Sequence, residues 1–268
     1  MEPHEDIRPA LEEALPRAAE AETLLVALDF DGTLAPFTDD PDDSRALPEA
    51  QSALEALLEL DRTYVAVISG RPMRFLRSVV DPAGRMLLSG SHGAELLLDA
   101  LGDAAADTEL QLSPAQEELL AQATALVEAQ VTRYPGSKLE LKPTGAAFHT
   151  RTMADQSRCA RAEQEMIEQF EQLEGLKITP GQHVVESSVH SATKGEGITA
   201  FMQATGADVT LFAGDDVTDE NAMRELGPAD LGIKVGTGET VATHRVASAE
   251  ELAAALTRLA GLRRDAQQ

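Results

Sequence analysis

The two ends of the chain share a pattern in which short apolar runs alternate with amphipathic stretches. Runs without polar alternation are typical of strands covered by helices on both faces, as in a parallel sheet. Amphipathic patterns at 47–60 and 250–262 predict two of the covering helices. Together they predict an α/β fold with a Rossmann-like parallel-sheet core. The first strand is expected within 24–34, before its two aspartates, and the others at 64–68, 86–88, 209–213 and 230–235.

The middle of the chain predicts a second unit inserted into this core. A stretch rich in Gly, Ala and Asp at 99–113 indicates a linker. The order of the elements after it, αββαββ, describes a compact α+β cap with its own sheet. Its elements are helices at 114–133, capped by Ser113, and 155–173, and strands at 138–142, 146–151, 176–179 and 183–187. We therefore predict a core of residues 1–98 and 188–268 and a cap domain of residues 99–187.

Charge and cysteine content limit what the protein binds and where it works. The 268 residues include 22 basic and 46 acidic ones, a net charge of −24, which disfavours nucleic acid or an anionic membrane as a partner. Cys159 is the only cysteine, so an intrachain disulfide is impossible and a reducing compartment is favoured. The chain has neither a signal-peptide pattern nor an apolar run of the roughly 20 residues that span a bilayer. We expect a cytoplasmic monomer that acts on a small molecule.

Two aspartates stand at the end of the first predicted strand. Asp29 and Asp31 precede Gly32 and Thr33, at the edge where an open α/β sheet presents its ligand crevice. The same residues are compatible with a surface turn, because Asp-Gly is a common turn pair. Acids at the end of a buried strand are unfavourable unless a cation meets them. This stretch therefore predicts a site that also contains cationic groups.

A serine follows the second predicted strand. Ser69 and Gly70 come directly after 64–68, and Pro72 suits the first turn of a helix. The free N–H groups of that turn and the serine hydroxyl would form a phosphate seat. The alternative interpretation is an ordinary N-cap serine.

A lysine is predicted at the start of another helix. Thr193 and Glu196 have the spacing of a capping box, which places Lys194 at the helix N-terminus, where an anion is favoured. The alternative is a solvated surface lysine. In the first interpretation its ammonium group adds a positive charge to an anion site.

A cluster of acids follows the strand at 209–213. Residues 214–220, GDDVTDE, contain four acids that would repel one another without a cation. Carboxylate oxygens without Cys or His nearby suit Mg²⁺ better than Zn²⁺. The candidate metal residues in this cluster are Asp215, Asp216 and Asp219.

These motifs resemble those of a known superfamily. DFDGTL at 29–34 looks like the nucleophile motif of the haloacid dehalogenase superfamily. The longer stretch 29–46 and the segment GSHGAE at 90–95 are similar to trehalose-6-phosphate phosphatases, as is the position of the cap insert. The resemblance covers about 22–262. It implies a haloacid dehalogenase-like core and a phosphatase that releases trehalose from trehalose 6-phosphate.

The resemblance also implies a role for each motif. Asp29 becomes the nucleophile that forms an aspartyl-phosphate, Asp31 the general acid and base, and Lys194 the cation that neutralises charge. Mg²⁺ is held by Asp29, Asp215 and the backbone carbonyl of Asp31, whereas Asp216 and Asp219 hold metal waters or Lys194. The implied phosphate-binding residues are Gly32, Ser69, Gly70 and Lys194, and the implied metal set is Asp29, Asp31, Asp215, Asp216 and Asp219.

Charged residues of the cap and its rim fall where these phosphatases contact the sugar. Without the resemblance they would indicate an exposed charged β face and, around residue 92, a turn. Thr150 stands where the family usually has an aromatic residue. Glu186 is followed by Ser187 and Ser188, whereas the family usually has Arg-Pro at these positions. The implied substrate-binding residues are His92, Glu140, Lys142, His149, Arg151 and Glu186.

Other functions fit parts of the same pattern. The chemistry also suits phosphatases for sucrose 6-phosphate, glucosylglycerol phosphate or mannosyl-3-phosphoglycerate, and a sugar phosphomutase. A non-catalytic phospho-aspartate switch uses an Asp cluster, a Ser or Thr and a Lys as well. The acid at Asp31 and the large cap argue against a switch, because a switch has no leaving group to protonate.

Overall fold

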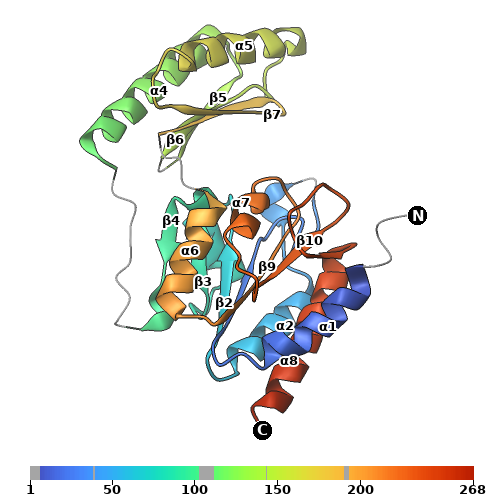
Figure 1. Ribbon diagram of the computed structural model, residues 1–268. Helices are drawn as coiled ribbons and strands as arrows, with labels where there is room; N and C mark the ends of the chain where they lie inside the picture. Colours follow the sequence, from blue (N-terminus) through green and yellow to red (C-terminus); the bar gives the residue numbers. More distant parts are fainter. Residues whose placement is uncertain (1–6, 39, 103–111, 143, 190–192) are drawn as a thin grey trace. The chain divides into compact units, whose positions relative to one another are not determined.

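The computed structural model describes residues 7–38, 40–102, 112–142, 144–189 and 193–268. The chain divides into two compact units, one of Met1–Glu109 with Ala192–Gln268 and the other of Leu110–Ser191 (Figure 1). The first unit is the core and the second is the cap. Part of the predicted linker, 103–111, lies outside the described residues.

A seven-stranded sheet forms the centre of the core, in the order β11-β10-β9-β1-β2-β3-β4. All neighbouring pairs are parallel except β3 with β4. The α/β prediction is confirmed, and β1 lies in the middle of the sheet. The strands are β1 (Leu24–Leu28), β2 (Thr63–Ile68), β3 (Leu87–Gly90), β4 (Glu95–Leu97), β9 (Val209–Gly214), β10 (Leu231–Val235) and β11 (His244–Val246).

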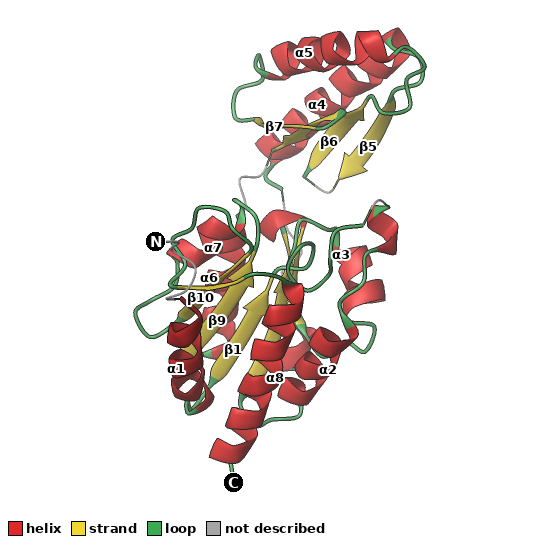
Figure 2. Ribbon diagram, turned by 90° about the vertical axis from the view of Figure 1, so that its right-hand side faces the viewer, coloured by secondary structure: helices red, strands yellow, loops and turns green. Residues whose placement is uncertain are grey.

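Helices cover both faces of this sheet, which explains the continuous apolar runs. Leu24, Val26 and Leu28 pack on the face covered by α1 (Ile7–Ala19), α2 (Pro48–Leu58) and α8 (Ala249–Ala266). Leu25 and Ala27 pack on the opposite face, covered by α6 (Lys194–Thr205) and α7 (Asp219–Arg224). In Figure 2, α2 and α8 lie side by side in front of the sheet. Every side chain of β1 is therefore buried.

Short elements at the margin of the core depart from the sequence pattern. The edge strands β4 and β11 have three residues each, too few for a periodic signal. After β2 the chain forms one turn of α-helix, α3 (Met73–Phe75), and a π-helical turn at Leu76–Val80. Both edge strands were missed by the sequence prediction, because their pairing partners rather than their composition define them.

The cap has the predicted order αββαββ and an antiparallel sheet β5-β6-β8-β7. Its apolar core includes Val127, Phe148, Met166 and Phe170, which fill the space between the two helices and one sheet face. The capping box at Ser113 forms as the sequence predicts. The elements are α4 (Pro114–Arg133), β5 (Lys138–Lys142), β6 (Gly145–His149), α5 (Cys159–Phe170), β7 (Lys177–Gly181) and β8 (Val184–Ser188).

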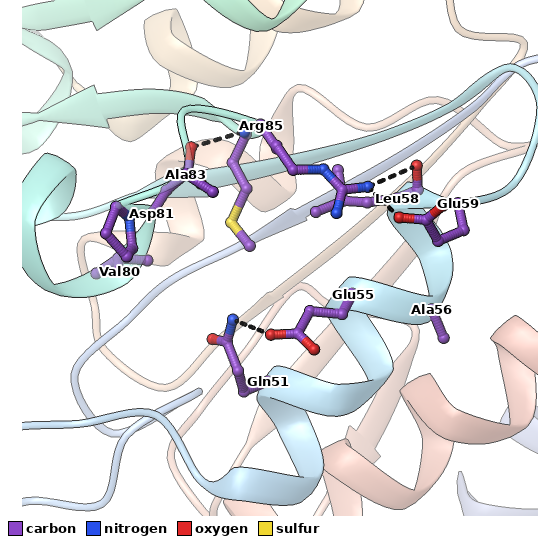
Figure 3. Close-up of a pocket in the computed structure, with 11 residues that line it drawn as sticks. Gln51, Glu55, Ala56, Leu58, Glu59, Val80, Asp81, Ala83 and Arg85 are labelled. Carbon is purple, nitrogen blue, oxygen red and sulfur yellow. Dashed lines mark hydrogen bonds and ion pairs between the residues drawn. The ribbon is translucent and has the colours of Figure 1, made fainter.

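A cavity of about 430 Å³ opens in the core between the end of α2 and the segment before β3 (Figure 3). Its polar groups pair with one another: Arg85 Nη2 contacts Glu59 Oε1 at 2.6 Å, and Gln51 donates to Glu55 at 3.1 Å. Its walls precede β2 and β3, so it lies at the amino end of the sheet.

None of the helices in the described ranges has the length and apolarity needed to cross a bilayer.

Candidate active site

The predicted motif residues stand at the carboxyl ends of adjacent parallel strands. Asp29 follows β1, and its N–H donates to the carbonyl of Ala213 in β9 at 2.9 Å. Ser69 follows β2 and Asp215 follows β9, the two neighbours of β1. Because the strands run in the same direction, these residues meet at one edge of the sheet.

Lys194 lies between two buried aspartates. Its Nζ is 2.6 Å from Asp29 Oδ1 and 2.6 Å from Asp219 Oδ1. The lysine is 3% exposed. The capping box of Thr193 and Glu196 fixes the start of α6 as predicted, and this places the lysine at the first helical position. The surface-lysine alternative is thus excluded.

Three carboxylates gather around this lysine. Asp29, Asp215 and Asp219 each offer an oxygen, and these oxygens lie within 4.8 Å of one another. The hydroxyl of Thr33 lies 3.3 Å from Asp29 Oδ2 and 3.1 Å from Asp215 Oδ1, between the two acids. Three acids meet one lysine, so the group has an excess of negative charge. Such a set of oxygen donors fits a hard divalent cation.

Two glycines make this close approach possible. A Cβ at Gly32 would lie 2.3 Å from Asp215 Oδ2, and Gly32 has a φ of +82°, which favours glycine. A Cβ at Gly214 would lie 2.3 Å from Asp219 Cγ. Any side chain at either position would push an acid out of the group.

Burial and mutual repulsion perturb the titration of the three acids. Burial raises the pKa of Asp29 to about 6, although the charge of Lys194 opposes the shift. Burial, followed by the charge of Asp29, raises the pKa of Asp219 to about 6. Burial and then the charge of Asp219 also raise the pKa of Asp215. For Lys194, burial lowers the pKa, but the charges of Asp29 and Asp219 outweigh it and raise the pKa overall.

Asp31 interacts with a different set of partners. Its two carboxylate oxygens accept hydrogen bonds from Arg71 Nε at 2.6 Å and from Arg71 Nη2 at 2.7 Å. The buried Ser44 donates to Asp31 Oδ1 at 2.9 Å. The hydrogen bonds that Arg71 donates to Asp31 raise the pKa of Arg71. The side chain of Asp31 is therefore not part of the three-carboxylate group, and only its backbone carbonyl is expected to contribute there.

Ser69, Gly70 and His92 form one local arrangement. Ser69 is 1% exposed, and its hydroxyl accepts the N–H of Arg71 at 3.2 Å. A Cβ at Gly70 would lie 2.5 Å from His92 Cε1, so the ring of His92 packs against the glycine. His92 has a φ of +59° and donates its N–H to the carbonyl of Ser69. The predicted rim residue therefore adjoins the predicted phosphate seat.

Asp216 lies apart from the other acids of its motif. Its side chain is exposed and accepts the N–H of Val217 at 2.6 Å, while its own N–H donates to Asp219 Oδ2 at 2.9 Å. Through this backbone bond Asp216 helps to hold Asp219. Its carboxylate is not a member of the three-carboxylate group.

The polar cap residues make two contacts on its sheet, a hydrogen bond between His149 and Glu140 and an ion pair between Lys142 and Glu186. His149 Nε2 lies 2.9 Å from Glu140 Oε2, and Lys142 Nζ lies 2.6 Å from Glu186 Oε1. The strand register places Glu140, Ala147 and Glu186 in one row across β5, β6 and β8. These four charged residues therefore share the face opposite the apolar core of the cap.

The flanking cap positions differ in orientation. Arg151 is exposed in the turn after β6. Thr150 is fully buried, and its hydroxyl donates to Glu163 of α5. The residue that replaces the usual aromatic therefore points toward the helices of the cap.

Several supporting residues were not singled out in the sequence. Arg71 follows Ser69-Gly70 directly, and its charge close to a strand end is the signal that could have identified it. Ser44 lies in a loop without periodicity, so no sequence signal was available. Lys234 is 2% exposed and lies 3.2 Å from Glu220 Oε1 and 3.3 Å from the carbonyl of Asp216. Burial raises the pKa of Glu220, but hydrogen bonds led by the N–H of Val241 outweigh it and lower the pKa.

The chain matches one protein family over most of its length. The profile of the family described as trehalose-phosphatase matches residues 27–255, which include both the motif strands and the cap. The chain is 30% identical over 229 residues to the trehalose-6-phosphate phosphatase of Escherichia coli, covering 84% of this chain and 82% of that protein. It is 32% identical to a bifunctional trehalose-6-phosphate synthase/phosphatase of Thermoproteus tenax, covering 90% of this chain and 32% of that protein.

Solved structures share the fold. The C-terminal domain of a C. albicans trehalose-6-phosphate phosphatase superposes with a TM-score of 0.74 at 20% identity, covering 97% of this chain and 98% of that chain. A sugar phosphatase of haloacid dehalogenase subclass IIB gives a TM-score of 0.60 at 16% identity, covering 90% of this chain and all of that chain (100%). The predicted haloacid dehalogenase-like fold is confirmed. With the family profile spanning core and cap, the chain belongs to the trehalose-phosphatase family of phosphoric monoester hydrolases.

Proposed function

We propose that this protein hydrolyses trehalose 6-phosphate to trehalose and inorganic phosphate. The observation that carries the proposal is the buried Lys194, held at 2.6 Å between Asp29 and Asp219 at the carboxyl end of β1. A buried carboxylate beside a fixed cation at a strand end is suited to attack a phosphate dianion, because the cation offsets the repulsion between the two anions.

The first half of the reaction transfers the phosphoryl group to the protein. A carboxylate oxygen of Asp29 forms a bond to phosphorus while the bond from phosphorus to the sugar oxygen breaks. Asp31 gives its proton to the departing oxygen, which leaves as the sugar hydroxyl. Lys194 keeps its proton throughout and neutralises charge on Asp29 and the phosphoryl oxygens. The products of this half are trehalose and an aspartyl-phosphate.

The second half returns Asp29 to its starting state. Asp31, now ionised, takes a proton from a water molecule as the water oxygen bonds to phosphorus. The bond between phosphorus and Asp29 breaks, and inorganic phosphate leaves. Asp31 ends protonated and Asp29 ends ionised, as both began.

The three-carboxylate group fits Mg²⁺. We propose that Asp29, Asp215 and the backbone carbonyl of Asp31 hold the ion, and that Asp219 and Asp216 fix the surrounding loop and Lys194. Oxygen donors without His or Cys, and a charge excess over Lys194, support this choice of metal. The bound ion would supply positive charge to the phosphoryl oxygens in the transition state.

Backbone and hydroxyl groups are proposed to hold the phosphate. Ser69 and Gly70 follow β2 directly, and Gly32 lies just after β1. The N–H of Gly32 donates to the carbonyl of Ala35 at 2.7 Å, which fixes the turn beside the proposed phosphate position. His92, which packs on Gly70, is proposed to border the sugar. Substitution of Gly70 would displace His92, so the phosphate and sugar contacts are expected to be sensitive to the same position.

The cap is proposed to select the sugar. The hydrogen bond between His149 and Glu140 and the ion pair of Lys142 with Glu186 offer donors and acceptors that suit sugar hydroxyls. Arg151 is proposed to join them from the turn after β6. The protein has no Trp and few aromatic residues, so hydrogen bonds rather than stacking must discriminate among sugars.

A substrate panel tests this proposal. Phosphate release with Mg²⁺ is measured for trehalose 6-phosphate, sucrose 6-phosphate, glucosylglycerol phosphate, mannosyl-3-phosphoglycerate and glucose 6-phosphate, with the Asp29→Asn variant as the blank for contaminating phosphatase. We expect the highest kcat/KM for trehalose 6-phosphate. A higher kcat/KM for another sugar phosphate would identify that compound as the preferred substrate instead. Isomerised sugar phosphate without phosphate release would indicate a mutase.

A further inference from the structure

Every oxygen of the Asp31 carboxylate already has a donor. Oδ2 receives Arg71 Nε at 2.6 Å, and Oδ1 receives both Arg71 Nη2 at 2.7 Å and the hydroxyl of Ser44 at 2.9 Å. A bidentate guanidinium fixes the plane of a carboxylate as well as its position. The orientation of Asp31 is therefore set by two side chains outside its own motif.

Arg71 is itself held from several sides. Its guanidinium carbon lies 4.6 Å from the ring centroid of Phe75, and the Phe75 ring meets the ring of Phe30 edge-on at 5.7 Å. Phe30 is the residue between Asp29 and Asp31. The backbone of Arg71 bonds to the hydroxyl of Ser69 and to the N–H of Ser91, so both ends of the residue are anchored.

We propose that Arg71, supported by Ser44, is the positioning residue for proton transfer from Asp31 to the leaving group. This inference rests on the proposed function and adds a residue to it. As the phosphorus–oxygen bond breaks, the proton moves from Asp31 to the departing oxygen and leaves a carboxylate behind. Arg71 stays protonated throughout, and its charge stabilises the carboxylate that forms.

The choice of Arg matters for this role. A lysine at the same place would supply a single point charge, whereas the guanidinium contacts both oxygens of Asp31 and stacks on Phe75. The charge alone would stabilise the carboxylate without fixing its plane. An Arg71→Lys variant should therefore keep only part of the function.

The test compares two leaving groups of similar shape. Phenoxide needs a proton as it departs, whereas 4-nitrophenoxide is stable without one. The value of kcat/KM covers the steps up to departure of the leaving group, so hydrolysis of the aspartyl-phosphate does not contribute. For Arg71→Ala we expect kcat/KM to fall by roughly ten- to a hundredfold on phenyl phosphate and by less than about fivefold on 4-nitrophenyl phosphate.

Four variants calibrate this result. The quantity compared is the ratio of kcat/KM on 4-nitrophenyl phosphate to kcat/KM on phenyl phosphate. Asp31→Asn sets the largest value of this ratio, and Arg71→Lys should give a value between those of wild type and Arg71→Ala. Ser44→Ala removes one donor and should shift the ratio in the same direction by a smaller amount. Arg74→Ala removes an exposed arginine from the same segment and should change neither substrate. Circular dichroism and thermal unfolding show that each variant is folded.

Two results would overturn the inference. An equal loss on both phenyl esters in Arg71→Ala and Arg71→Lys would indicate phosphate binding or a structural role. A wild-type ratio in Arg71→Lys and Ser44→Ala would show that Asp31 needs no positioning. The proposed function fails separately, in the wild-type protein, if no sugar phosphate of the panel is preferred, because the aryl esters report on Arg71 whichever sugar is bound.

Discussion

Two buried cations stand at opposite ends of the core sheet, and their surroundings differ. Lys194, at the carboxyl end, contacts two buried carboxylates at 2.6 Å each. Arg263, at the amino end, is 1% exposed and donates to neutral oxygens. Its acceptors are the hydroxyl of Thr63 and the backbone carbonyls of Ala19, Ala21, Glu22, Asp61 and Arg62.

The difference separates a structural site from a chemical one. Around Arg263 the carbonyls that precede β1 and β2 receive a donor, so the group stabilises the chain where the strands begin. Burial lowers the pKa of Arg263, yet a guanidinium stays charged. Around Lys194 the acids outnumber the cation, and the pKa of Asp29 and that of Asp219 are both raised to about 6 by burial. The excess negative charge at that end would bind a metal ion, and one of its carboxylates would attack phosphorus in the proposed reaction.

Removing the proposed nucleophile should produce the largest effect. We expect Asp29→Asn to lower kcat by at least about a thousandfold, because the proposed mechanism requires this carboxylate to attack phosphorus. The midpoint of thermal unfolding without metal should stay equal or rise at pH 7, since a buried acid with a raised pKa has been removed. Phosphate release and calorimetry measure the two effects.

An exposed acid provides the control for that variant. Asp265→Asn changes the same residue type near the end of α8 and should leave both kcat and the unfolding midpoint unchanged. Turnover by Asp29→Asn within tenfold of the wild-type rate would contradict the nucleophile assignment.

Neutralising Lys194 should give the second largest effect, on both activity and stability. In Lys194→Met the two buried carboxylates lose their cation, so we expect kcat/KM to fall by about 10²- to 10³-fold. Leaving these charges unpaired should also cost about 3–5 kcal/mol of the free energy of unfolding at pH 7.

Lys234→Met is the matched comparison, since Lys234 is equally buried but pairs with Glu220. It should lower stability while reducing kcat/KM by less than about tenfold. Equal losses of activity in the two variants would mean that Lys194 acts only through the fold.

The sequence predicted the core and the cap because their signals are local. An unbroken apolar run such as 24–28 indicates burial on both faces, and Ser113 and Thr193 mark helix starts with capping boxes that form as expected. The strands β4 and β11 were missed, since three residues have no period and their existence depends on a neighbouring strand.

The candidate site could be predicted as a set of residues but not as a geometry. Parallel strands bring Asp29 and Asp215 to one edge, which follows from their positions at strand ends. The pairing of Asp31 with Arg71 and Ser44 depends on how a loop folds back, and no spacing in the sequence encodes it. The same is true of Arg263, whose acceptors come from segments about 200 or more residues away in the chain.

Removing the charge of Arg263 should lower stability and leave activity almost unchanged. Arg263→Met removes the donor to the carbonyls before β1 and β2, and we expect a loss of about 3 kcal/mol in the free energy of unfolding. At a temperature where the variant is folded, kcat/KM should stay within about twofold of wild type. Arg264→Met, an exposed neighbour, controls for the loss of charge and should leave both unchanged. A tenfold fall in kcat/KM without loss of stability would contradict this division of roles.

A change of pH should alter stability without any substitution. Asp29 and Asp219 titrate near an ordinary value of 3.8 when unfolded and near about 6 when folded. Between these values the folded protein binds more protons, so their contribution to the free energy of unfolding falls as the pH rises and the loss is complete above about 6. Each acid should contribute about 3 kcal/mol to this decline in protein without metal.

Magnesium should act in the opposite direction over the same window. Because Mg²⁺ binds ionised carboxylates and competes with their protons, the stabilisation it gives should be small at pH 5 and grow until about pH 7. Thermal unfolding with EDTA and with Mg²⁺ across this range measures it, and Asp219→Asn should flatten the decline seen in EDTA because one of the two acids is gone. A Mg²⁺-induced shift that stays constant from pH 5 to pH 7 would show that the ion binds away from these carboxylates, and the excess charge around Lys194 would then need another explanation.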